Sequence, residues 1–519
     1  MASKNSTKYF IKQIHKKILL LFKHNAWLFL LLIPLFPTIA LAQEVPESGF
    51  LGAIDTFFSN IVNFLAAIFF FEVLGIPFIV LWLIIAAIFF TFRMGFVNLR
   101  GFKHAIDVVQ GKYDDPNDEG DVSHFQALAT ALSGTVGLGN IAGVAIAVQV
   151  GGPGAIVWMT LGGFFGMTSK FVECTLGQMY RRVLPDGTVA GGPMYYISAG
   201  LAERGMRPFG KGLALLFALL CVLASFGGGN MFQANQAYAA VAGIVPGLPN
   251  WIFGLVVAIL VGFVIIGGIN RIASVTSRLV PAMAVIYVLA CLWIILTNIP
   301  EIPNAIATII SQAFSPTAVE GGIIGVLVQG IRRSAFSNEA GMGSAAIAHS
   351  AARTDEPLRE GIVALLEPFI DTIVICNLTA LTIVITGIYQ DTAAAELNGV
   401  ELTAAAFNTV IGWFPIILAI AVALFAFSTM ISWSYYGEKC WSYMFGSNSA
   451  LIYKGIFVLC VFIGSVVNLG AVLDFSDMML LAMAFPNLLG CYILSGKVAS
   501  TLKDYMGRLS SGQMEMTPH

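Results

Sequence analysis

The stretch that decides the fold is a glycine-rich run inside an otherwise apolar segment, Ser133-Gly134-Thr135-Val136-Gly137-Leu138-Gly139-Asn140-Ile141-Ala142-Gly143. Four of these residues are glycines, and each costs a helix interior roughly 1 kcal/mol relative to alanine. We therefore expect a regular helix to be weakened here. A second run places polar residues and glycines inside another apolar stretch, Phe336-Ser337-Asn338-Glu339-Ala340-Gly341-Met342-Gly343-Ser344.

The composition around these runs is that of a membrane protein. The chain has 519 residues, of which 57% are hydrophobic and 11% charged, against a charged share of about 25% in soluble domains. A water-soluble globule is therefore excluded. The 53 glycines favour many closely packed transmembrane helices, so we predict an all-α polytopic protein in a lipid bilayer. The formal net charge of −2 gives no sign of a nucleic-acid partner.

Eleven segments of roughly 20 apolar residues are long enough to cross about 30 Å of hydrocarbon. They lie near 66–92, 126–149, 153–179, 212–239, 251–268, 279–298, 320–349, 361–387, 407–433, 451–468 and 472–495. A further segment, 302–315, is too short to span, and we interpret it as a surface helix.

The N-terminus has the layout of a secretory signal. Lysines precede the apolar run Ala26 to Ile39, which ends in an A-x-A site at 40–42; a retained anchor helix would show the same pattern. We therefore assign 1–42 to a signal peptide or anchor. Residues 43–125 are predicted to hold one transmembrane helix and a cytoplasmic connection, and 496–519 a cytoplasmic tail.

Positive charges give the predicted orientation, because lysine and arginine accumulate on the cytoplasmic side. Of the 27 lysines and arginines, six lie in the leader and 19, including Lys170, fall on the inside loops or their edges. The remaining two are Arg332 and Arg333, inside the seventh span. The predicted outside loops contain none. We expect a multi-pass protein of the plasma membrane, the inner membrane in a bacterium, with a cytoplasmic C-terminus.

The spans divide into two halves of opposite orientation. Residues 126–298 and 320–495 each hold five helices, joined by an outside connection at 299–319, and an odd number of helices inverts the second half. Each half opens with its interrupted helix. Paired interruptions in inverted halves point to the central site of a transporter.

An interrupted helix can bind ions, because its unwound turn leaves backbone groups unpaired in hydrocarbon. Freed amides attract a carboxylate, and freed carbonyls attract Na⁺ or an ammonium group. Such a site suits a zwitterion plus a cation. The first run alone also fits tight helix packing through small residues. It fits a nucleotide-binding fingerprint less well, because its spacing is G-x-G-x-x-x-G and no strand precedes it.

Other function classes find less support in the sequence. No Gly-Lys pair is followed by Ser or Thr, so an ATP-driven pump is disfavoured. The seven cysteines have no C-x-x-C spacing and are interpreted as packing residues. The six histidines show no H-x-x-x-H spacing, and we assign them no role. We therefore expect neither an enzyme nor a bound metal ion other than Na⁺. An ion channel would need repeated rings or subunit symmetry.

Three runs resemble the alanine or glycine:cation symporter family: Ser133 to Gly143, Gly330 to Ala345 and Ser432 to Glu438. The resemblance implies the leucine-transporter fold of inverted five-helix repeats, here with one preceding helix. It also implies sodium-coupled import of small neutral amino acids such as alanine and glycine by alternating access, without a cofactor. The open alternatives are another substrate on the same fold, such as nucleobases or larger amino acids, and an ion channel.

The resemblance also implies the roles of individual residues. The substrate carboxylate would meet amides around Leu138 and Gly139, with Phe336 closing over it and Trp433 limiting the pocket to small side chains. The full set implied for the substrate is Thr135, Gly137, Leu138, Gly139, Asn140, Phe336, Ser337 and Trp433. The set implied for sodium is the hydroxyls of Ser428 and Thr429 with the carbonyls of Ser133 and Val136.

Simpler roles stay open for several of these residues. The hydroxyls of Ser428 and Thr429 can bond back to the preceding helical turn, and Trp433 can anchor the helix at the membrane interface. Asn230 and Gln233 can line the pocket or form interhelical hydrogen bonds.

Arg332 and Arg333 are costly inside a membrane, about 3 kcal/mol or more each. One interpretation, which extends to Glu339, is a gate or an anion-attracting vestibule. The other, which we favour, is structural pairing with a buried acid, and the candidates are Glu173, Glu339, Glu367 and Asp371.

Overall fold

The computed structural model describes residues 63, 65–115, 117–184, 188–315, 322–391, 397, 399–410, 412–467 and 469–514. The chain divides into two units, Met1–Ile68 and Phe69–His519. In the first unit the described residues, 63 and 65–68, are helical, and the signal or anchor predicted over 1–42 lies outside the described part. The fold below is that of the second unit.

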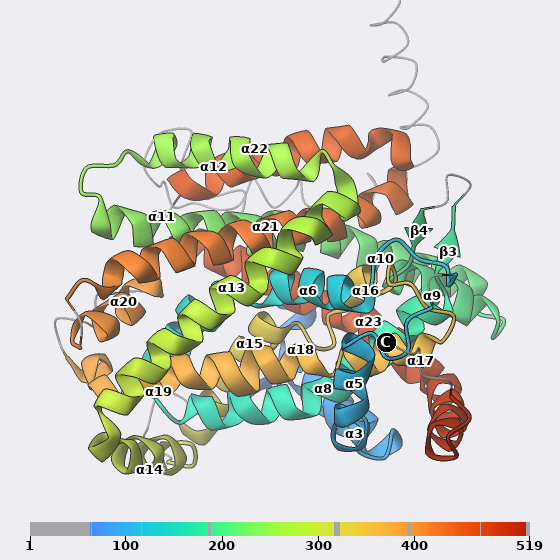
Figure 1. Ribbon diagram of the computed structural model, residues 1–519, viewed down its shortest axis with the longest axis horizontal. Helices are drawn as coiled ribbons and strands as arrows, with labels where there is room; N and C mark the ends of the chain where they lie inside the picture. Colours follow the sequence, from blue (N-terminus) through green and yellow to red (C-terminus); the bar gives the residue numbers. More distant parts are fainter. Residues whose placement is uncertain are drawn as a thin grey trace, which may run out of the picture. The chain divides into compact units, whose positions relative to one another are not determined.

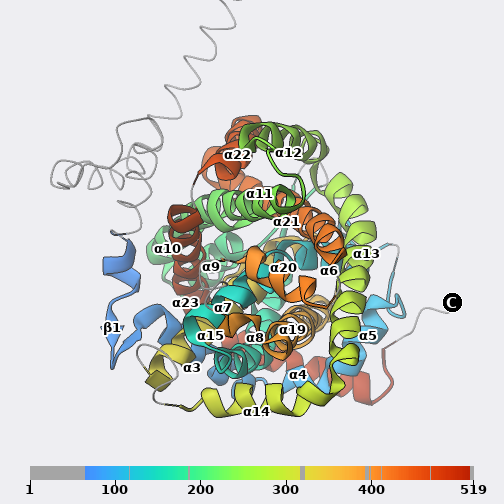
Figure 2. The same ribbon diagram turned by 90° about the vertical axis from the view of Figure 1, so that its left-hand side faces the viewer.

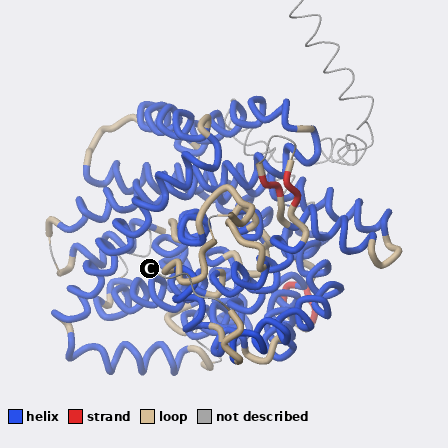
Figure 3. Tube along the Cα trace, turned by 45° about the vertical axis from the view of Figure 1, so that its right-hand side comes forward, coloured by secondary structure: helices blue, strands red, loops and turns tan. Residues whose placement is uncertain are grey.

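The first half of this unit is helical apart from two short antiparallel hairpins (Figure 3). Its elements are β1 (Glu72–Val73), β2 (Ile76–Pro77), α3 (Phe78–Arg93), α4 (Val97–Arg100), α5 (Phe102–Val109), α6 (His124–Thr135), η3 (Gly139–Gly143), α7 (Val144–Gly151), α8 (Ala155–Met179), β3 (Arg182–Val183), β4 (Val189–Ala190), α9 (Pro193–Ala202), α10 (Arg207–Phe226), η4 (Gly227–Met231), α11 (Phe232–Ile244), α12 (Asn250–Ile265) and α13 (Gly268–Thr297).

The second half contains only helical elements among its described residues. They are η5 (Ile299–Glu301), α14 (Ile302–Gln312), α15 (Gly322–Asn338), α16 (Ser344–His349), α17 (Pro357–Val363), α18 (Leu366–Pro368), η6 (Phe369–Cys376), α19 (Asn377–Thr386), η7 (Ile388–Gln390), α20 (Val400–Asn408), α21 (Phe414–Phe445), η9 (Ser447–Ser449), α22 (Ala450–Val466) and α23 (Leu469–Ser510).

The long helices run between two ends of a bundle (Figure 1). One end carries α5, the β3–β4 hairpin and α9. We call it the basic end because Lys103 belongs to α5 and Arg182 to β3, and further lysines and arginines adjoin these elements in the sequence: Arg100, Lys112, Arg181, Arg204, Arg207 and Lys211. The opposite end carries α14 and α20. Seen from that end, α20 lies near the centre, with α11, α13, α21 and α19 around it (Figure 2).

Every one of the eleven expected spans coincides with a helical segment, but not all have full length. Among the described residues, seven helices are long and apolar enough to cross a membrane, and the bent pair α6 and α7 makes eight. The spans expected at 66–92 and 251–268 correspond to α3 and α12, which have 16 residues each. The span at 320–349 is divided between α15 and α16. The surface helix expected at 302–315 corresponds to α14, which is largely exposed.

Both predicted interruptions are present. A capping box formed by Ser123 and Gln126 starts α6, which ends at Thr135, and the chain bends by 50° before it continues through η3 into α7. In the second half α15 ends at Asn338. The turn that follows contains Glu339 at a φ of 55° and two glycines at 86°, Gly341 and Gly343, a region that favours glycine and is costly for glutamate.

Two further irregularities were not predicted. A π-helical turn, η4, interrupts the helix formed by α10 and α11, and a second one, η6, lies between α18 and α19. Such turns occur often at functional sites. The glycines at 227–229 weaken the helix at η4, whereas η6 contains no glycine that would have indicated it.

The position predicted for Lys170 is wrong. We placed it at the inside edge of a span, but it is fully buried within α8, where its ammonium nitrogen lies 3.3 Å from a carboxylate oxygen of Glu367. A buried acid offsets the cost of a lysine at this depth, and hydropathy alone does not reveal such a partner.

The contact between α5 and α23 gives the fold a pH dependence at the basic end. His104 Nε2 lies 2.7 Å from the Tyr505 hydroxyl, and burial lowers the pKa of His104 to about 4. Burial disfavours the charged imidazole in the folded state. His104 therefore contributes its full stabilisation to the folded state above pH 6.5, and this contribution is lost as the pH falls towards 4. We expect hydrogen exchange in α5, corrected for chemical exchange, to rise between pH 7 and 4.5. The His104→Gln variant should show no such rise, and equal rises in both proteins would contradict this assignment.

Candidate functional site

The two helix breaks meet inside the bundle. A Cβ atom added to Gly139 would lie only 3.1 Å from the Cα of Ser337 and 3.5 Å from the ring of Phe336. Glycine is therefore favoured at this position, because a larger residue would push the two backbones apart. The first break thus lies directly against the end of α15.

Asp371 holds the two breaks together. Its Oδ1 accepts a hydrogen bond from Asn140 Nδ2 at 2.5 Å, and its Oδ2 accepts one from Ser337 Oγ at 2.8 Å. Asn140 belongs to the first break and Ser337 to the end of α15, while Asp371 lies in η6. All three side chains are fully buried. The sequence analysis named Asp371 only as a partner for the arginines, and that prediction is wrong.

A small cavity lies where the breaks meet. It has room for about one water-sized molecule, and it is walled by backbone and side chains of both halves. The lining residues are Gly134, Thr135, Gly139, Gly228, Gln233, Phe336, Glu339, Trp433 and Leu480. Four of the eight residues implied for the substrate line it: Thr135, Gly139, Phe336 and Trp433. The other four, Gly137, Leu138, Asn140 and Ser337, do not line it.

The amides of the first break have side-chain partners. Gly137 N donates to Asn140 Oδ1 at 2.9 Å, and Leu138 N donates to Gln233 Oε1 at 3.3 Å. Gln233 also lines the cavity, so both roles left open for it, pocket lining and an interhelical hydrogen bond, are observed. Asn230 instead donates an interhelical hydrogen bond to the Phe457 carbonyl at 2.8 Å.

Trp433 belongs to the cavity wall and not to the membrane interface. Its side chain is buried, and its Nε1 donates to Glu339 Oε1 at 2.9 Å. The other oxygen of Glu339 accepts a hydrogen bond from Ser344 at the start of α16. The interpretation of Trp433 as an interface anchor is therefore wrong. Glu339, which we had considered as a gate or as a partner for arginine, is a carboxylate on the cavity wall.

The residues implied for sodium lie together on α6 and α21. Thr429 Oγ1 donates to the Ser133 carbonyl at 3.0 Å, and Ser133 Oγ donates to the Ser428 carbonyl at 2.7 Å. Gly137 packs against Thr429, which brings the Val136–Gly137 peptide to the same place. Ser428 Oγ bonds back to the Phe425 carbonyl at 2.9 Å. The cluster offers neutral oxygen atoms, which are the ligands that a hard cation such as Na⁺ prefers.

The two arginines pair with an acid that the sequence analysis did not name. The Nη2 atoms of Arg332 and Arg333 both contact Asp477 Oδ2 on α23, the former at 3.1 Å. Pairing is thus confirmed, but Glu173, Glu339, Glu367 and Asp371 are the wrong partners. The ion pairs lie one helical turn before the cavity residues Phe336 and Leu480, on α15 and α23 respectively.

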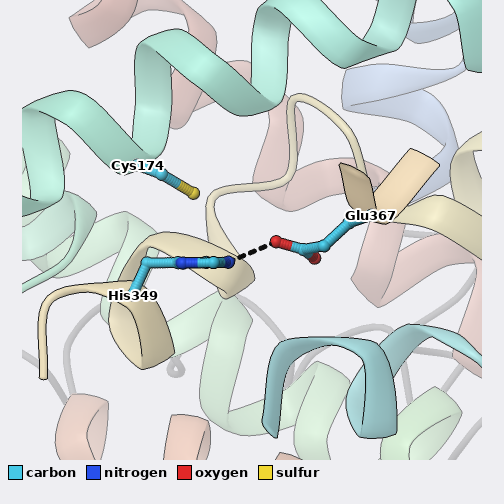
Figure 4. Close-up of side chains that lie close together, drawn as sticks. All are labelled: Cys174, His349 and Glu367. Carbon is cyan, nitrogen blue, oxygen red and sulfur yellow. Dashed lines mark hydrogen bonds and ion pairs between the residues drawn. The ribbon is translucent and has the colours of Figure 1, made fainter. Parts of the chain in front are cut away.

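Cys174, His349 and Glu367 come close enough to suggest a metal centre (Figure 4). However, His349 Nε2 is hydrogen bonded to Glu367 Oε1, and Glu367 Oε2 lies 3.3 Å from Lys170 Nζ. A metal would need the lone pair of that nitrogen, and the lysine ammonium repels a cation. The arrangement is that of a buried ion-pair network. The sequence analysis had assigned the histidines no role, and for His349 this was wrong.

A wider groove of about 710 Å³ lies between α11, α20, α21 and α22. It is lined mainly by apolar and small polar side chains and contains no residue of either helix break. Size alone would favour this groove as the substrate site, but residues of both helix breaks and the buried acid Glu339 line the smaller cavity.

The fold and the paired breaks can now be compared with known proteins. The family model described as the sodium:alanine symporter family matches residues 56–518. The chain belongs to this family. It is therefore a membrane carrier of a family of cation-coupled amino-acid symporters, which is not a class of enzymes.

Relatives in the sodium:alanine symporter family match most of the chain. The sodium/alanine symporter AgcS of Methanococcus maripaludis is 44% identical over 430 residues, which are 83% of this chain and 94% of that protein. The amino-acid carrier protein AlsT of Bacillus subtilis is 37% identical over 469 residues, 88% of this chain and 94% of AlsT. The probable sodium/glutamine symporter GlnT of B. subtilis is 36% identical over 431 residues, 82% of this chain and 87% of GlnT.

A solved structure confirms the predicted architecture. The crystal structure of MhsT in complex with L-phenylalanine superposes with a TM-score of 0.51 at 16% identity, covering 72% of this chain and 89% of that chain. At this identity the likeness concerns the fold alone. It is the leucine-transporter fold of inverted repeats that the sequence analysis expected for this family member.

Proposed function

We propose that this carrier imports small neutral amino acids, such as alanine and glycine, together with Na⁺. The observation that supports this proposal most strongly is the cavity between the two helix breaks, with Gly139 on one side and Glu339 on the other. In this proposal the substrate carboxylate displaces the side chains of Asn140 and Gln233 from the amides of Gly137 and Leu138. Glu339 then binds the ammonium group. An α-amino acid carries both of these charges.

Phe336 and Trp433 restrict the size of the substrate in this proposal. Both rings line the cavity, and Trp433 is fixed by its hydrogen bond to Glu339. Because the cavity has room for about one water-sized molecule, it must widen to admit any amino acid, and alanine and glycine require less widening than glutamine.

The coupling ion would bind at Ser133, Val136, Ser428 and Thr429. At a membrane potential of order 100 mV one Na⁺ supplies about 2.3 kcal/mol, and each tenfold concentration gradient adds about 1.4 kcal/mol. One ion therefore suffices for substantial accumulation of substrate.

Alternating access requires a closure on each side of the cavity. We assign the outer closure to Arg332, Arg333 and Asp477, which join α15 to α23 one turn away from the cavity. The basic end would then face the cytoplasm, in agreement with the distribution of lysine and arginine. In this orientation the C-terminus is cytoplasmic and the protein lies in the plasma membrane.

The experiment that tests this function is counterflow in proteoliposomes. Liposomes loaded with unlabelled alanine take up labelled alanine or glycine, with Na⁺, Li⁺, K⁺ or H⁺ as the only cation gradient. We expect counterflow with Na⁺ alone, and at least tenfold less for glutamine than for alanine. Accumulation of glutamine or a nucleobase in preference to alanine would overturn the substrate assignment. Equal counterflow rates with K⁺ and with Na⁺ would overturn the assignment of Na⁺ as the coupling ion.

The sodium assignment gives a graded prediction for the two hydroxyls. Thr429 bonds across to α6, whereas Ser428 bonds back within α21. We therefore expect Thr429→Ala to raise the Na⁺ concentration for half-maximal alanine uptake at least tenfold, and more than Ser428→Ala does. The control is Ser434→Ala, because Ser434 is buried on the same helix and bonds only back to Ile431. An unchanged sodium dependence in a normally expressed Thr429→Ala variant would remove the residue from the ion site.

A further inference from the structure

A pocket of about 660 Å³ lies at the basic end between β3, α9, α10 and α21. It contains no residue of either helix break, so it is separate from the cavity and from the wide groove described above. Three cations line this basic pocket: Arg182 of β3, and Arg207 and Lys211 from the first five residues of α10. All three residues are exposed. In Figure 1, β3 and α9 mark this end of the bundle.

The protein leaves the charge of these cations uncompensated. Within the described part of the chain, none of the three forms an ion pair. Glu203 is the one acid among the described residues of the lining. Its carboxylate lies 3.3 Å from Lys497 Nζ and accepts a hydrogen bond from the Tyr180 hydroxyl at 2.7 Å. Glu203 and Lys497 therefore balance each other, and the basic pocket keeps an excess of three positive charges.

Two of the cations are unfavourable for the helix that carries them. Arg207 is the first residue of α10, where the helix dipole favours a negative charge. Lys211 follows four residues later, and like charges at this spacing repel each other. A bound anion would remove both penalties, because it is attracted by the two cations and by the amides at the start of the helix. The placement of the cations thus favours an anionic ligand.

The helix ridge that begins with these cations continues into apolar side chains. Leu215 and Leu219 follow Lys211 at intervals of four residues, which places the three on one ridge of α10, and both leucines are half-buried. Phe209, beside Arg207 in the first turn, is 50% exposed. Because Arg207–Ile244 is long and apolar enough to cross a membrane, the cations lie at the polar end of this span and the leucines lie further inside. A phospholipid has the same order of charge and hydrocarbon, whereas a free phosphate would use only the cations.

Two tyrosines complete the basic pocket on the side of α9 and α21. The rings of Tyr195 and Tyr443 lie 5.3 Å apart, and the Arg182 guanidinium lies over the Tyr195 ring at 5.8 Å from its centroid. Tyrosine is enriched where hydrocarbon meets water, because its ring is apolar and its hydroxyl is polar. The hydroxyls can also donate hydrogen bonds to phosphate or glycerol oxygens. These residues therefore place the pocket at the membrane boundary.

We propose that the basic pocket binds the head group of an anionic phospholipid, such as phosphatidylglycerol, from the membrane leaflet at the basic end. The phosphodiester contacts Arg182, Arg207 and Lys211. The acyl chains run along Leu215 and Leu219 of α10. In the orientation proposed above this is the cytoplasmic leaflet, where basic pockets between membrane helices bind anionic lipids. Neither the substrate nor the coupling ion enters this assignment.

The test is the binding of defined lipids to the purified full-length carrier. Delipidated carrier in a neutral detergent is titrated with dioleoyl phosphatidylglycerol or dioleoyl phosphatidylcholine, and bound lipid is counted by native mass spectrometry. We expect phosphatidylglycerol to bind at least tenfold more tightly. Each cation near a membrane surface strengthens the attraction of an anionic lipid roughly fivefold. The triple variant Arg182→Gln, Arg207→Gln and Lys211→Gln should therefore bind phosphatidylglycerol at least tenfold more weakly and phosphatidylcholine as before.

A second triple variant controls for the overall change of charge. Lys103→Gln, Arg278→Gln and Arg353→Gln together remove three cations from exposed positions outside the basic pocket. This control should bind phosphatidylglycerol as the wild type does. Equal affinities for the two lipids, or an equal loss in both triple variants, would overturn the inference.

Two further measurements keep the assignment open to refutation. Inorganic phosphate in large excess should leave phosphatidylglycerol bound, and full displacement by phosphate would show a site for a soluble anion instead of a lipid. If the pocket triple variant does not fold, Lys211→Gln alone should weaken phosphatidylglycerol binding at least threefold. Unchanged binding in a folded Lys211→Gln variant would then overturn the assignment.

Discussion

The Asp371→Ala variant is expected to lose sodium-dependent alanine uptake by at least 100-fold. Asp371 accepts hydrogen bonds from Asn140, Ser337 and Thr372, and hydrogen bonds to a charged group contribute about 1.5–3 kcal/mol each. Without the carboxylate, buried donors of both helix breaks lose their partner. The breaks then no longer keep the separation that the cavity requires. Uptake in proteoliposomes, normalised to the amount of folded carrier, measures the effect.

Two further variants separate this role from a general loss of stability. Asp371→Asn keeps the size and one acceptor oxygen, so we expect it to fold and to retain a fraction of the uptake. Asp504→Asn removes an exposed acid near the C-terminus and should leave uptake unchanged. Wild-type uptake by Asp371→Ala would show that Asp371 does not hold the two breaks in their working arrangement.

The second large effect is expected at Asp477. Removal of one partner from a buried ion pair costs about 3–5 kcal/mol. Asp477→Asn removes the carboxylate that contacts both arginines and leaves them only the weaker electrostatic interaction with Asp474. We expect this variant to be poorly folded, with loss of the monodisperse peak in gel filtration. Arg332→Ala should have a much smaller effect, because the Arg332 side chain is 25% exposed and Arg333 remains paired.

A double variant distinguishes a gate from a purely structural pair. Replacing Arg333 and Asp477 together by Met and Leu removes the buried pair and restores an apolar contact, which is often neutral for stability. If the pair closes the outer path, the folded double variant should release bound alanine at least tenfold faster than the wild type. Wild-type release and uptake in this double variant would contradict the gate and leave a structural role.

The sequence predicts the two helix breaks because their signal is local. Glycines at 134, 137, 139 and 143 weaken one helix, and Glu339 with two glycines interrupts the other. A break at the middle of a span needs no knowledge of its neighbours, and both breaks were predicted with the correct residues. The sodium role of Ser428 and Thr429 stays a prediction.

The partners of the buried charges could not be predicted in the same way. Arg333 and Asp477 are 144 residues apart, and Asn140 and Asp371 are 231 residues apart. Hydropathy gives the depth of a residue in a span but not the direction in which its side chain points. For that reason Lys170 was placed at a helix edge, and Asp371 was assigned to the wrong partner.

The histidines show a second limit of local patterns. His124 and His349 lie far apart in the sequence and meet only through Glu360, so no spacing rule finds them. The useful signal would have been the count of buried acids against bases in the spans, since every acid inside a membrane needs a partner or a proton.

The most direct test of the central claim is a structure of the carrier solved with alanine and Na⁺. We expect alanine density between the two breaks, in contact with Gly139, Phe336 and Glu339, and a sodium ion beside Thr429 and the Ser133 carbonyl. Alanine density in the wide groove between α11, α20 and α21, with the space between the breaks still closed, would contradict it.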